Sequence, residues 1–176
     1  MLIILLYHKN YKWGEKLASL AVLDATGRED IQAIIEEGLV KLPNPGVTFV
    51  GQNSIDAGAV PDIIVVSQRV GDRPPANLKG NCKILLVPGT AINLTSIIKA
   101  ECVISYGMSK KDSVTLSSIG DGESVLTLQR ELPTLAGKVL ERQDILVRSK
   151  RKYSPDDIMA GTAALLLLGL NPEELK

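Results

Sequence analysis

Two side chains of this sequence could act as proton donors or acceptors in a reaction. His8 follows the apolar run of residues 2–7, and Tyr106 follows the apolar run of residues 103–105. An imidazole titrates close to neutral pH, and a positioned phenol can also transfer a proton. We therefore take His8 and Tyr106 as candidate acid/base groups. The alternative for His8 is a partly exposed histidine in a loop.

A second group of residues has the chemistry to bind an anion. Arg69 and Arg73 flank a glycine, and guanidinium groups bind carboxylate or phosphate through paired donors. Gly89 and Thr90 precede a predicted helix, whose first amides favour an anion. The alternative for the two arginines is a solvated loop or a salt bridge to Asp72, and the alternative for Thr90 is a simple N-cap. The candidate anion-binding residues are Arg69, Arg73, Gly89, Thr90 and Lys110.

Several common catalytic and cofactor motifs are missing from the sequence. It contains no GxxxxGK[ST] phosphate loop, no GxGxxG after a predicted strand and no GxSxG nucleophile turn. The single histidine cannot build a multi-histidine metal site, and no carboxylate cluster has recognisable ligand spacing. We therefore expect no cofactor and no metal, and an enzymatic role is less favoured than a binding role.

Composition is typical of a soluble globular protein and excludes some partners. The chain has 176 residues, is 45% hydrophobic, and has 20 basic and 20 acidic residues. This charge balance gives no overall field for nucleic acid. No run is long enough to span a bilayer and residues 1–7 lack the features of a signal peptide, so we expect a cytoplasmic protein without membrane contact. Cys82 and Cys102 are expected to be buried structural thiols.

The apolar runs predict short buried strands that alternate with helices. Continuous apolar strands are typical of a parallel sheet covered on both faces, and the intervening helices imply right-handed crossovers. The fold class is therefore α/β, with a mostly parallel, doubly wound, Rossmann-like sheet in three layers. The predicted strands cover residues 2–7, 47–50, 62–66, 83–87 and 102–105; helices cover 13–24, 26–37 (capped by Thr26) and 93–99; a loop covers 69–80.

The pattern changes after residue 111, within what we expect to be one domain of residues 1–176. Alternating residues 113–117 and 124–129 flank Gly120-Asp121-Gly122 and predict an antiparallel hairpin. Residues 138–140 and 145–148 are expected to extend it, which gives an antiparallel region over residues 112–148. Ser154 and Pro155 predict the start of a final helix over residues 154–169, packed on the parallel core of residues 1–111.

Four candidate residues follow different predicted strands. They are His8, Arg69, Thr90 and Tyr106. Because the carboxyl ends of parallel strands meet at one edge of a sheet, we expect these side chains to converge there. The sequence thus predicts a mildly basic pocket that suits a small anionic ligand.

Residues 101–175 resemble part of a known family. A strand ending in Tyr106-Gly107 is followed by a polar gap, the hairpin, an Ala- and Leu-rich helix and Asn171-Pro172-Glu173-Glu174. This series is similar to the latter half of the central domain of Mur-type amino-acid ligases. The family's phosphate-binding Gly-Lys-Thr/Ser loop and its metal-binding positions have no counterpart, and Ser154-Pro155-Asp156-Asp157 replaces its usual His-Asn. The resemblance implies a stand-alone relative that kept the scaffold and lost ATP-dependent ligation.

Three functions are compatible with these patterns. The first is a noncatalytic cytoplasmic domain that binds a small anionic metabolite or a protein partner at the carboxyl edge of the sheet. The second is an enzyme that uses His8 or Tyr106 as acid/base, with Arg69 orienting an acidic substrate. The third is an oligomerisation module in which the hairpin of residues 112–130 pairs edge to edge with another copy.

Overall fold

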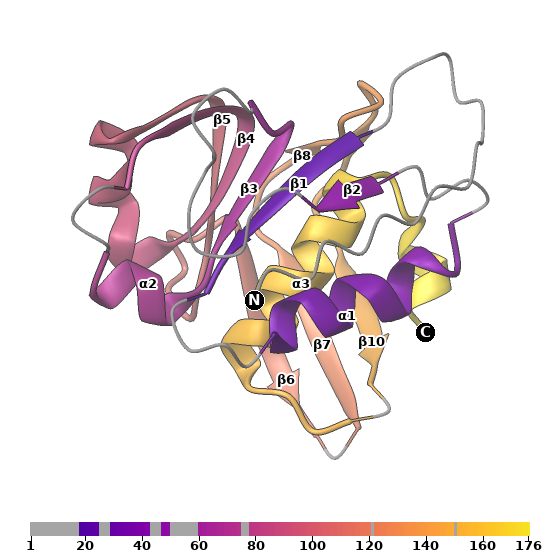
Figure 1. The fold of residues 1–176 in the computed structure, drawn as a ribbon. Coiled ribbons are helices and arrows are strands. Elements are labelled where there is room, and N and C mark those ends of the chain that lie inside the picture. Colours follow the sequence, from indigo (N-terminus) through magenta and orange to yellow (C-terminus); the bar gives the residue numbers. More distant parts are fainter. Residues whose placement is uncertain are drawn as a thin grey trace.

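An eight-stranded sheet forms the centre of the molecule, with a separate two-stranded sheet beside it (Figure 1). The computed structural model describes residues 18–24, 29–42, 47–49, 60–74, 78–120, 122–149 and 151–176. Within these ranges the strand order of the large sheet is β10-β7-β6-β5-β4-β3-β1-β2. The mostly parallel α/β fold predicted from the sequence is confirmed.

The parallel half of the sheet runs from β2 to β5 and continues in parallel to β6. Its order β2-β1-β3-β4-β5 reverses between β1 and β3, because the chain moves outward from β1 to β2 and then returns to the other side of β1. Such a reversal creates a crevice at the carboxyl ends of the two strands. The strands are β1 (Ala18–Leu23), β2 (Val47–Phe49), β3 (Ile63–Val66), β4 (Gly80–Pro88) and β5 (Ile98–Tyr106).

The antiparallel half confirms the predicted hairpin and one of its two predicted extensions. β6 (Val114–Ile119) pairs with β7 (Glu123–Leu128), and β7 pairs with β10 (Asp144–Arg148). Residues 138–140 are expected from the sequence to pair with the hairpin, and this prediction is wrong. β9 (Val139–Leu140) instead pairs with β8 (Leu132–Pro133) in the small sheet. A tight turn with Gly137 at φ 77° returns the chain directly to β8, so these residues never reach the hairpin.

Helices cover both faces of the large sheet and give the fold its three layers (Figure 1). α1 (Asp30–Leu39) and α3 (Pro155–Leu167) pack on one face, where they share a core with the even-numbered residues of β1. Val70 of α2 (Gln68–Asp72) and two apolar residues of the 3₁₀ helix η1 (Gly89–Ser96) lie in the core of the other face. A second 3₁₀ helix, η2 (Pro172–Leu175), follows α3.

Two glycines allow α1 and α3 to approach each other closely. A Cβ atom on Gly161 of α3 would lie 2.6 Å from Cγ2 of Ile34 in α1, and a Cβ atom on Gly38 of α1 would collide with Leu165. Close-packed interiors leave no room for the extra methyl groups. Helices α1 and α3 therefore pack closely against each other at these two glycines.

The helix predicted over residues 13–24 is wrong in its described part. Residues 18–23 form β1, a central strand in which Leu20 and Ala21 are fully buried. A short apolar run buried on both faces has no strand periodicity, so its pattern does not distinguish a strand from a buried helix. The strand predicted at residues 2–7 and the Thr26 cap lie outside the described residues; the helix expected to follow that cap begins at Asp30 and ends at Leu39.

Two further boundaries differ from the sequence prediction. The segment predicted as a loop from residue 69 begins with α2, which Ser67 caps by accepting a hydrogen bond from the Val70 amide and which ends before Pro74. The helix predicted over residues 93–99 is a 3₁₀ helix that ends at Ser96. Lys99 already belongs to β5, because that strand extends back to pair with the first residues of β4.

The final helix α3 confirms its predicted start. The Ser154 hydroxyl accepts a hydrogen bond from the Asp157 amide at 3.1 Å, and Pro155 is the first helical residue. Every residue from Asp157 to Leu167 is buried, so α3 is a core helix rather than a surface helix. No helix in the described ranges is both long and apolar enough to cross a membrane.

Candidate functional site

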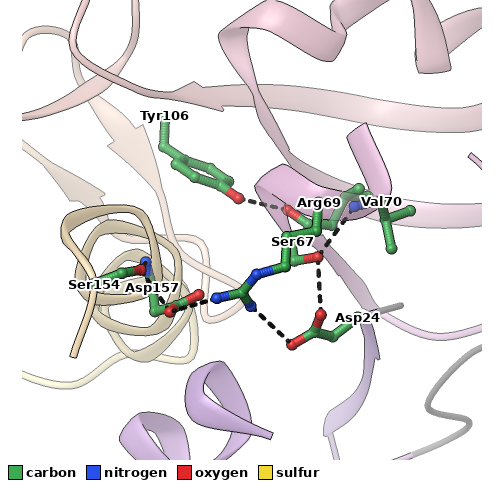
Figure 2. Close-up of polar contacts among 8 residues, drawn as sticks. Asp24, Ser67, Arg69, Val70, Tyr106, Ser154 and Asp157 are labelled. Carbon is green, nitrogen blue, oxygen red and sulfur yellow. Dashed lines mark hydrogen bonds and ion pairs between the residues drawn. The ribbon is translucent and has the colours of Figure 1, made fainter. Parts of the chain in front are cut away.

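The candidate site lies at the carboxyl ends of β1 and β3, where the strand order reverses (Figure 2). Asp24 directly follows β1, and Ser67 directly follows β3. The Ser67 hydroxyl donates to Oδ1 of Asp24 at 3.3 Å, so the two strand ends are joined by side chains. Both residues are buried, with Asp24 only 7% exposed.

Arg69 of α2 connects these strand ends to the last helix. One terminal guanidinium nitrogen lies 3.7 Å from Oδ2 of Asp24, and the other lies 3.7 Å from Oδ2 of Asp157 (Figure 2). The arginine side chain is 31% exposed, whereas the carboxyl side chains are 8% and 4% exposed. Arg69 therefore places a positive charge between two buried acids while remaining accessible from outside.

The N-terminus of α3 contributes two carboxyl groups to this region. Burial raises the pKa of Asp157, and this effect exceeds the opposing influence of a hydrogen bond from Ser154 and the charge of Arg69. Burial also raises the pKa of Asp156, again against the influence of Arg69. The Ser154 hydroxyl donates to Oδ2 of Asp157 at 2.5 Å and fixes this carboxyl group beside the arginine.

Tyr106, one of the two candidate acid/base residues, is held inside the protein. Its side chain is fully buried, and its hydroxyl donates to the backbone carbonyl of Val66 at 2.7 Å (Figure 2). Burial raises the pKa of Tyr106 well above that of a free phenol, and the nearby Asp156 and Asp157 add to this rise. This geometry suits a structural link between β5 and β3. The other candidate, His8, lies outside the described residues.

Thr90 is joined to the same helix as Arg69. Nε2 of Gln68 donates to the Thr90 hydroxyl at 2.9 Å and to Oδ1 of Asp72 at 3.0 Å. The end of β4 is thereby connected to α2. The structure thus brings Arg69 and Thr90 to the same edge, as the sequence predicts, although no hydrogen bond between them is present in the described ranges.

Gly89, another candidate anion ligand, lies against a carboxyl group. A Cβ atom on Gly89 would be 2.8 Å from Cγ of Asp112, and one on Gly107 would be 2.6 Å from its Oδ2. The Ser109 amide also donates to Oδ2 of Asp112 at 3.1 Å. Asp112 therefore occupies the space beside the two glycines, where β4 and β5 end.

The remaining candidates are exposed. Arg73 follows α2, and Lys110 lies in the turn between β5 and β6. Neither forms an ion pair with another residue of the described ranges. Of the two arginines in the predicted anion site, only Arg69 is thus integrated into the strand-end cluster.

The acidic members of the site were missed or given another role in the sequence prediction. The sequence pattern predicts Asp24 at the end of a helix, and it predicts Asp156 and Asp157 only in the first turn of the final helix. Their position in the sequence could have indicated Asp24 and Ser67 as site residues, because each directly follows an apolar run.

Charge around Arg69 differs from the mildly basic pocket that the sequence predicts. Three carboxyl groups, those of Asp24, Asp156 and Asp157, act on one guanidinium group. They are not arranged as a metal centre, because the described ranges contain no group of three or more His, Cys, Asp or Glu residues suited to an ion.

Comparison with known proteins adds no family assignment. No protein-family model matches the chain, and no curated protein matches it.

Proposed function

We propose that the chain is a noncatalytic, cytoplasmic α/β domain that binds a small charged metabolite where the strand order reverses between β1 and β3. The position of Arg69 between Asp24 and Asp157 carries this proposal. Open α/β sheets bind their ligands in the crevice at such a reversal. The free thiols of Cys82 and Cys102 favour a reducing compartment.

Arg69 is the residue that we assign to recognition of an acidic group on the ligand. Guanidinium groups bind carboxylate and phosphate through two parallel hydrogen bonds. This arginine is partly exposed, while its acidic neighbours are buried behind it. A ligand that approaches from solvent therefore meets the positive group first.

The surrounding acids narrow the ligand class. A purely anionic ligand bound at Arg69 would also lie near the carboxyl groups of Asp24, Asp156 and Asp157, which would repel it. A molecule that carries an amino group as well as a carboxylate would satisfy both signs of charge. We therefore favour a zwitterion of the amino-acid type over the purely anionic metabolite that the sequence predicts.

Binding is favoured over catalysis by the environment of Tyr106. A general acid or base must reach the proton that it transfers, with a pKa near the working pH. The Tyr106 hydroxyl is instead buried and donates to Val66, and its pKa is raised well above its ordinary value. We assign Tyr106 to the scaffold of the site.

The order of elements after β5 supports including the Mur-type resemblance in this proposal. β5 ends in Tyr106, the antiparallel β6 and β7 follow, and the Ala- and Leu-rich α3 comes next. This is the order that the resemblance implies. In this proposal the chain retains that scaffold as a binding domain without ATP-dependent ligation.

Isothermal titration with defined probes tests the proposal. The probes are alanine and glutamate as zwitterions, with succinate, inorganic phosphate and a nucleoside monophosphate as anions. We expect heat of binding from a zwitterion, and Arg69→Gln should weaken its affinity roughly 10- to 100-fold, as expected when a charged hydrogen-bond partner is removed. Arg73→Gln is the matched control, since Arg73 is exposed beyond the same helix.

Two results would contradict the proposal. One is equal affinity of the wild-type protein and the Arg69→Gln variant for a bound probe. The other is the absence of binding by every probe at millimolar concentration, with the protein shown to be folded by circular dichroism.

A further inference from the structure

Strand β10 is the long open edge of the sheet. β7 lies between β6 and β10, so the hairpin strand β7 has both neighbours and offers no edge to another copy. In the described part of the chain, β10 pairs with β7 alone. The opposite end of the sheet is β2, which has three residues against the five of β10. An open edge presents unpaired backbone donors and acceptors to solvent.

The backbone hydrogen bonds show which peptide groups of β10 face outward. The Leu128 amide donates to the Gln143 carbonyl, and the Ser149 amide donates to the Gly122 carbonyl. These bonds place the odd-numbered residues of this segment in the ladder with β7, because peptide groups alternate in direction along a strand. The peptide groups on the open edge belong to Asp144, Leu146 and Arg148.

The sequence of β10 is self-complementary when two copies run antiparallel. We propose that β10 pairs with β10 of a second copy about a twofold axis at Leu146, which joins two sheets into one. Asp144 of each copy then lies opposite Arg148 of the other, and Ile145 lies opposite Val147. This inference is independent of the proposed ligand site.

The charges select this register over its neighbours. With the axis at Leu146, both charged pairs are of opposite sign and all five residues of the strand take part. An axis at Ile145 would leave Arg148 without a β10 residue opposite it. An axis at Val147 would leave Asp144 without a β10 residue opposite it.

Contacts within one copy already orient the charged groups. Nε of Arg148 lies 2.8 Å from Oε1 of Glu123, and the Thr127 hydroxyl donates to Oδ1 of Asp144 at 2.6 Å. Pairing of the two edges would extend these contacts across the axis.

The apolar centre of the strand matches this arrangement. Leu146 is half-buried and pairs with Val125 of β7 on the outer face, which is also half-buried. Two copies would join these residues into one apolar row between the two charged pairs. Such symmetric, self-complementary contact is the usual form of a closed dimer.

Sedimentation equilibrium tests the association and its location. We expect the wild-type mass to rise from one chain to two between about 1 μM and about 1 mM. Leu146→Pro should abolish the dimer without unfolding the protein, because this residue donates no bond to β7 and edge strands tolerate proline on the open side. A wild-type monomer at 1 mM, or a Leu146→Pro dimer, would overturn the inference.

A cysteine test remains decisive if Leu146→Pro does not fold. In a variant with Cys82 and Cys102 replaced by alanine, Leu146→Cys should form a disulfide-linked dimer on mild oxidation. Directly opposite residues on hydrogen-bonded antiparallel strands have Cα atoms about 5.5 Å apart, within disulfide range. Glu141→Cys is the control, because it lies opposite residue 151 and should not cross-link to itself. Equal cross-linking of the two variants would overturn the proposed register.

Discussion

Arg69 of α2 lies 3.7 Å from Asp157 of α3, so the edge of the parallel sheet is tied to the start of the last helix. The same guanidinium group lies 3.7 Å from Asp24 at the end of β1. One side chain thus joins three segments that are far apart in the sequence, and its replacement has consequences for stability as well as for binding.

Replacement of Arg69 by Gln should destabilise the fold. The change removes the guanidinium charge that lies 3.7 Å from the buried carboxyl groups of Asp24 and Asp157. We expect a loss of about 1–3 kcal/mol in the free energy of unfolding, measured by urea titration at pH 7. Arg73→Gln should change it by less than about 0.5 kcal/mol, as is usual for exposed positions. Equal losses for the two variants would contradict the role given to Arg69.

Asp156 should reduce stability at neutral pH. Burial raises its pKa in the folded protein, so the folded state holds this proton more tightly than the unfolded state does. The contribution of Asp156 to stability therefore falls as pH rises from the unfolded pKa near 3.9 through the raised folded pKa. Asp156→Asn should be more stable than the wild-type protein at pH 7, and the difference should shrink towards pH 3.5. Thermal unfolding at pH 7 and pH 3.5 measures the stability difference between the variant and the wild-type protein. A difference that grows towards low pH would contradict the predicted pH dependence.

Asp62 should behave in the opposite way. Burial alone would raise its pKa, but hydrogen bonds from Lys83 and Ser19 outweigh burial and lower it. The Lys83 ammonium lies 2.7 Å from Oδ1 of Asp62. This carboxylate therefore contributes stability above the unfolded pKa, and the contribution is lost as pH falls through the lowered folded value. Asp62→Asn should be less stable than the wild-type protein at pH 7, with the gap closing in acid. A stability difference between the two proteins that does not change with pH would show that ionisation of Asp62 does not contribute to stability.

Tyr106→Phe separates a structural role from a catalytic one. The change removes the hydrogen bond to the buried Val66 carbonyl and should cost about 1–3 kcal/mol of unfolding free energy, the cost of an unsatisfied buried acceptor. Affinity for a probe that binds the wild-type protein should change less than threefold under conditions where both proteins are folded. A loss of binding comparable to that of Arg69→Gln would place the phenol in direct contact with the ligand.

Local signals in the sequence predicted the elements that depend on near neighbours. Ser154 and Pro155 specify the start of α3 through the cap that they form, and the alternating residues around Gly122 specify the hairpin. The sequence predicts a helix where the structure has β1, because the fully buried residues of β1 do not alternate between apolar and polar. Only its place between β2 and β3 makes it a strand.

The sequence predicts where in the fold the candidate site lies better than it predicts the sign of the charge around Arg69. The strand ends predict the edge at which the structure places Arg69 and Thr90. The contact of Asp157 with Arg69 joins residues from opposite halves of the chain, and Asp112 fits beside Gly89 only because two strands end side by side. Neither relationship leaves a short motif, so the acidic surroundings of Arg69 emerge only from the fold.

Chemical-shift mapping tests the central claim most directly. Backbone amide spectra of the wild-type protein, titrated with the zwitterion that binds in calorimetry, should change most at Asp24, Ser67, Arg69 and the first turn of α3. The shifts should saturate with the calorimetric affinity and be lost or weakened in Arg69→Gln. Saturable shifts confined to other elements, with the ends of β1 and β3 unaffected, would contradict a binding site at the reversal of strand order.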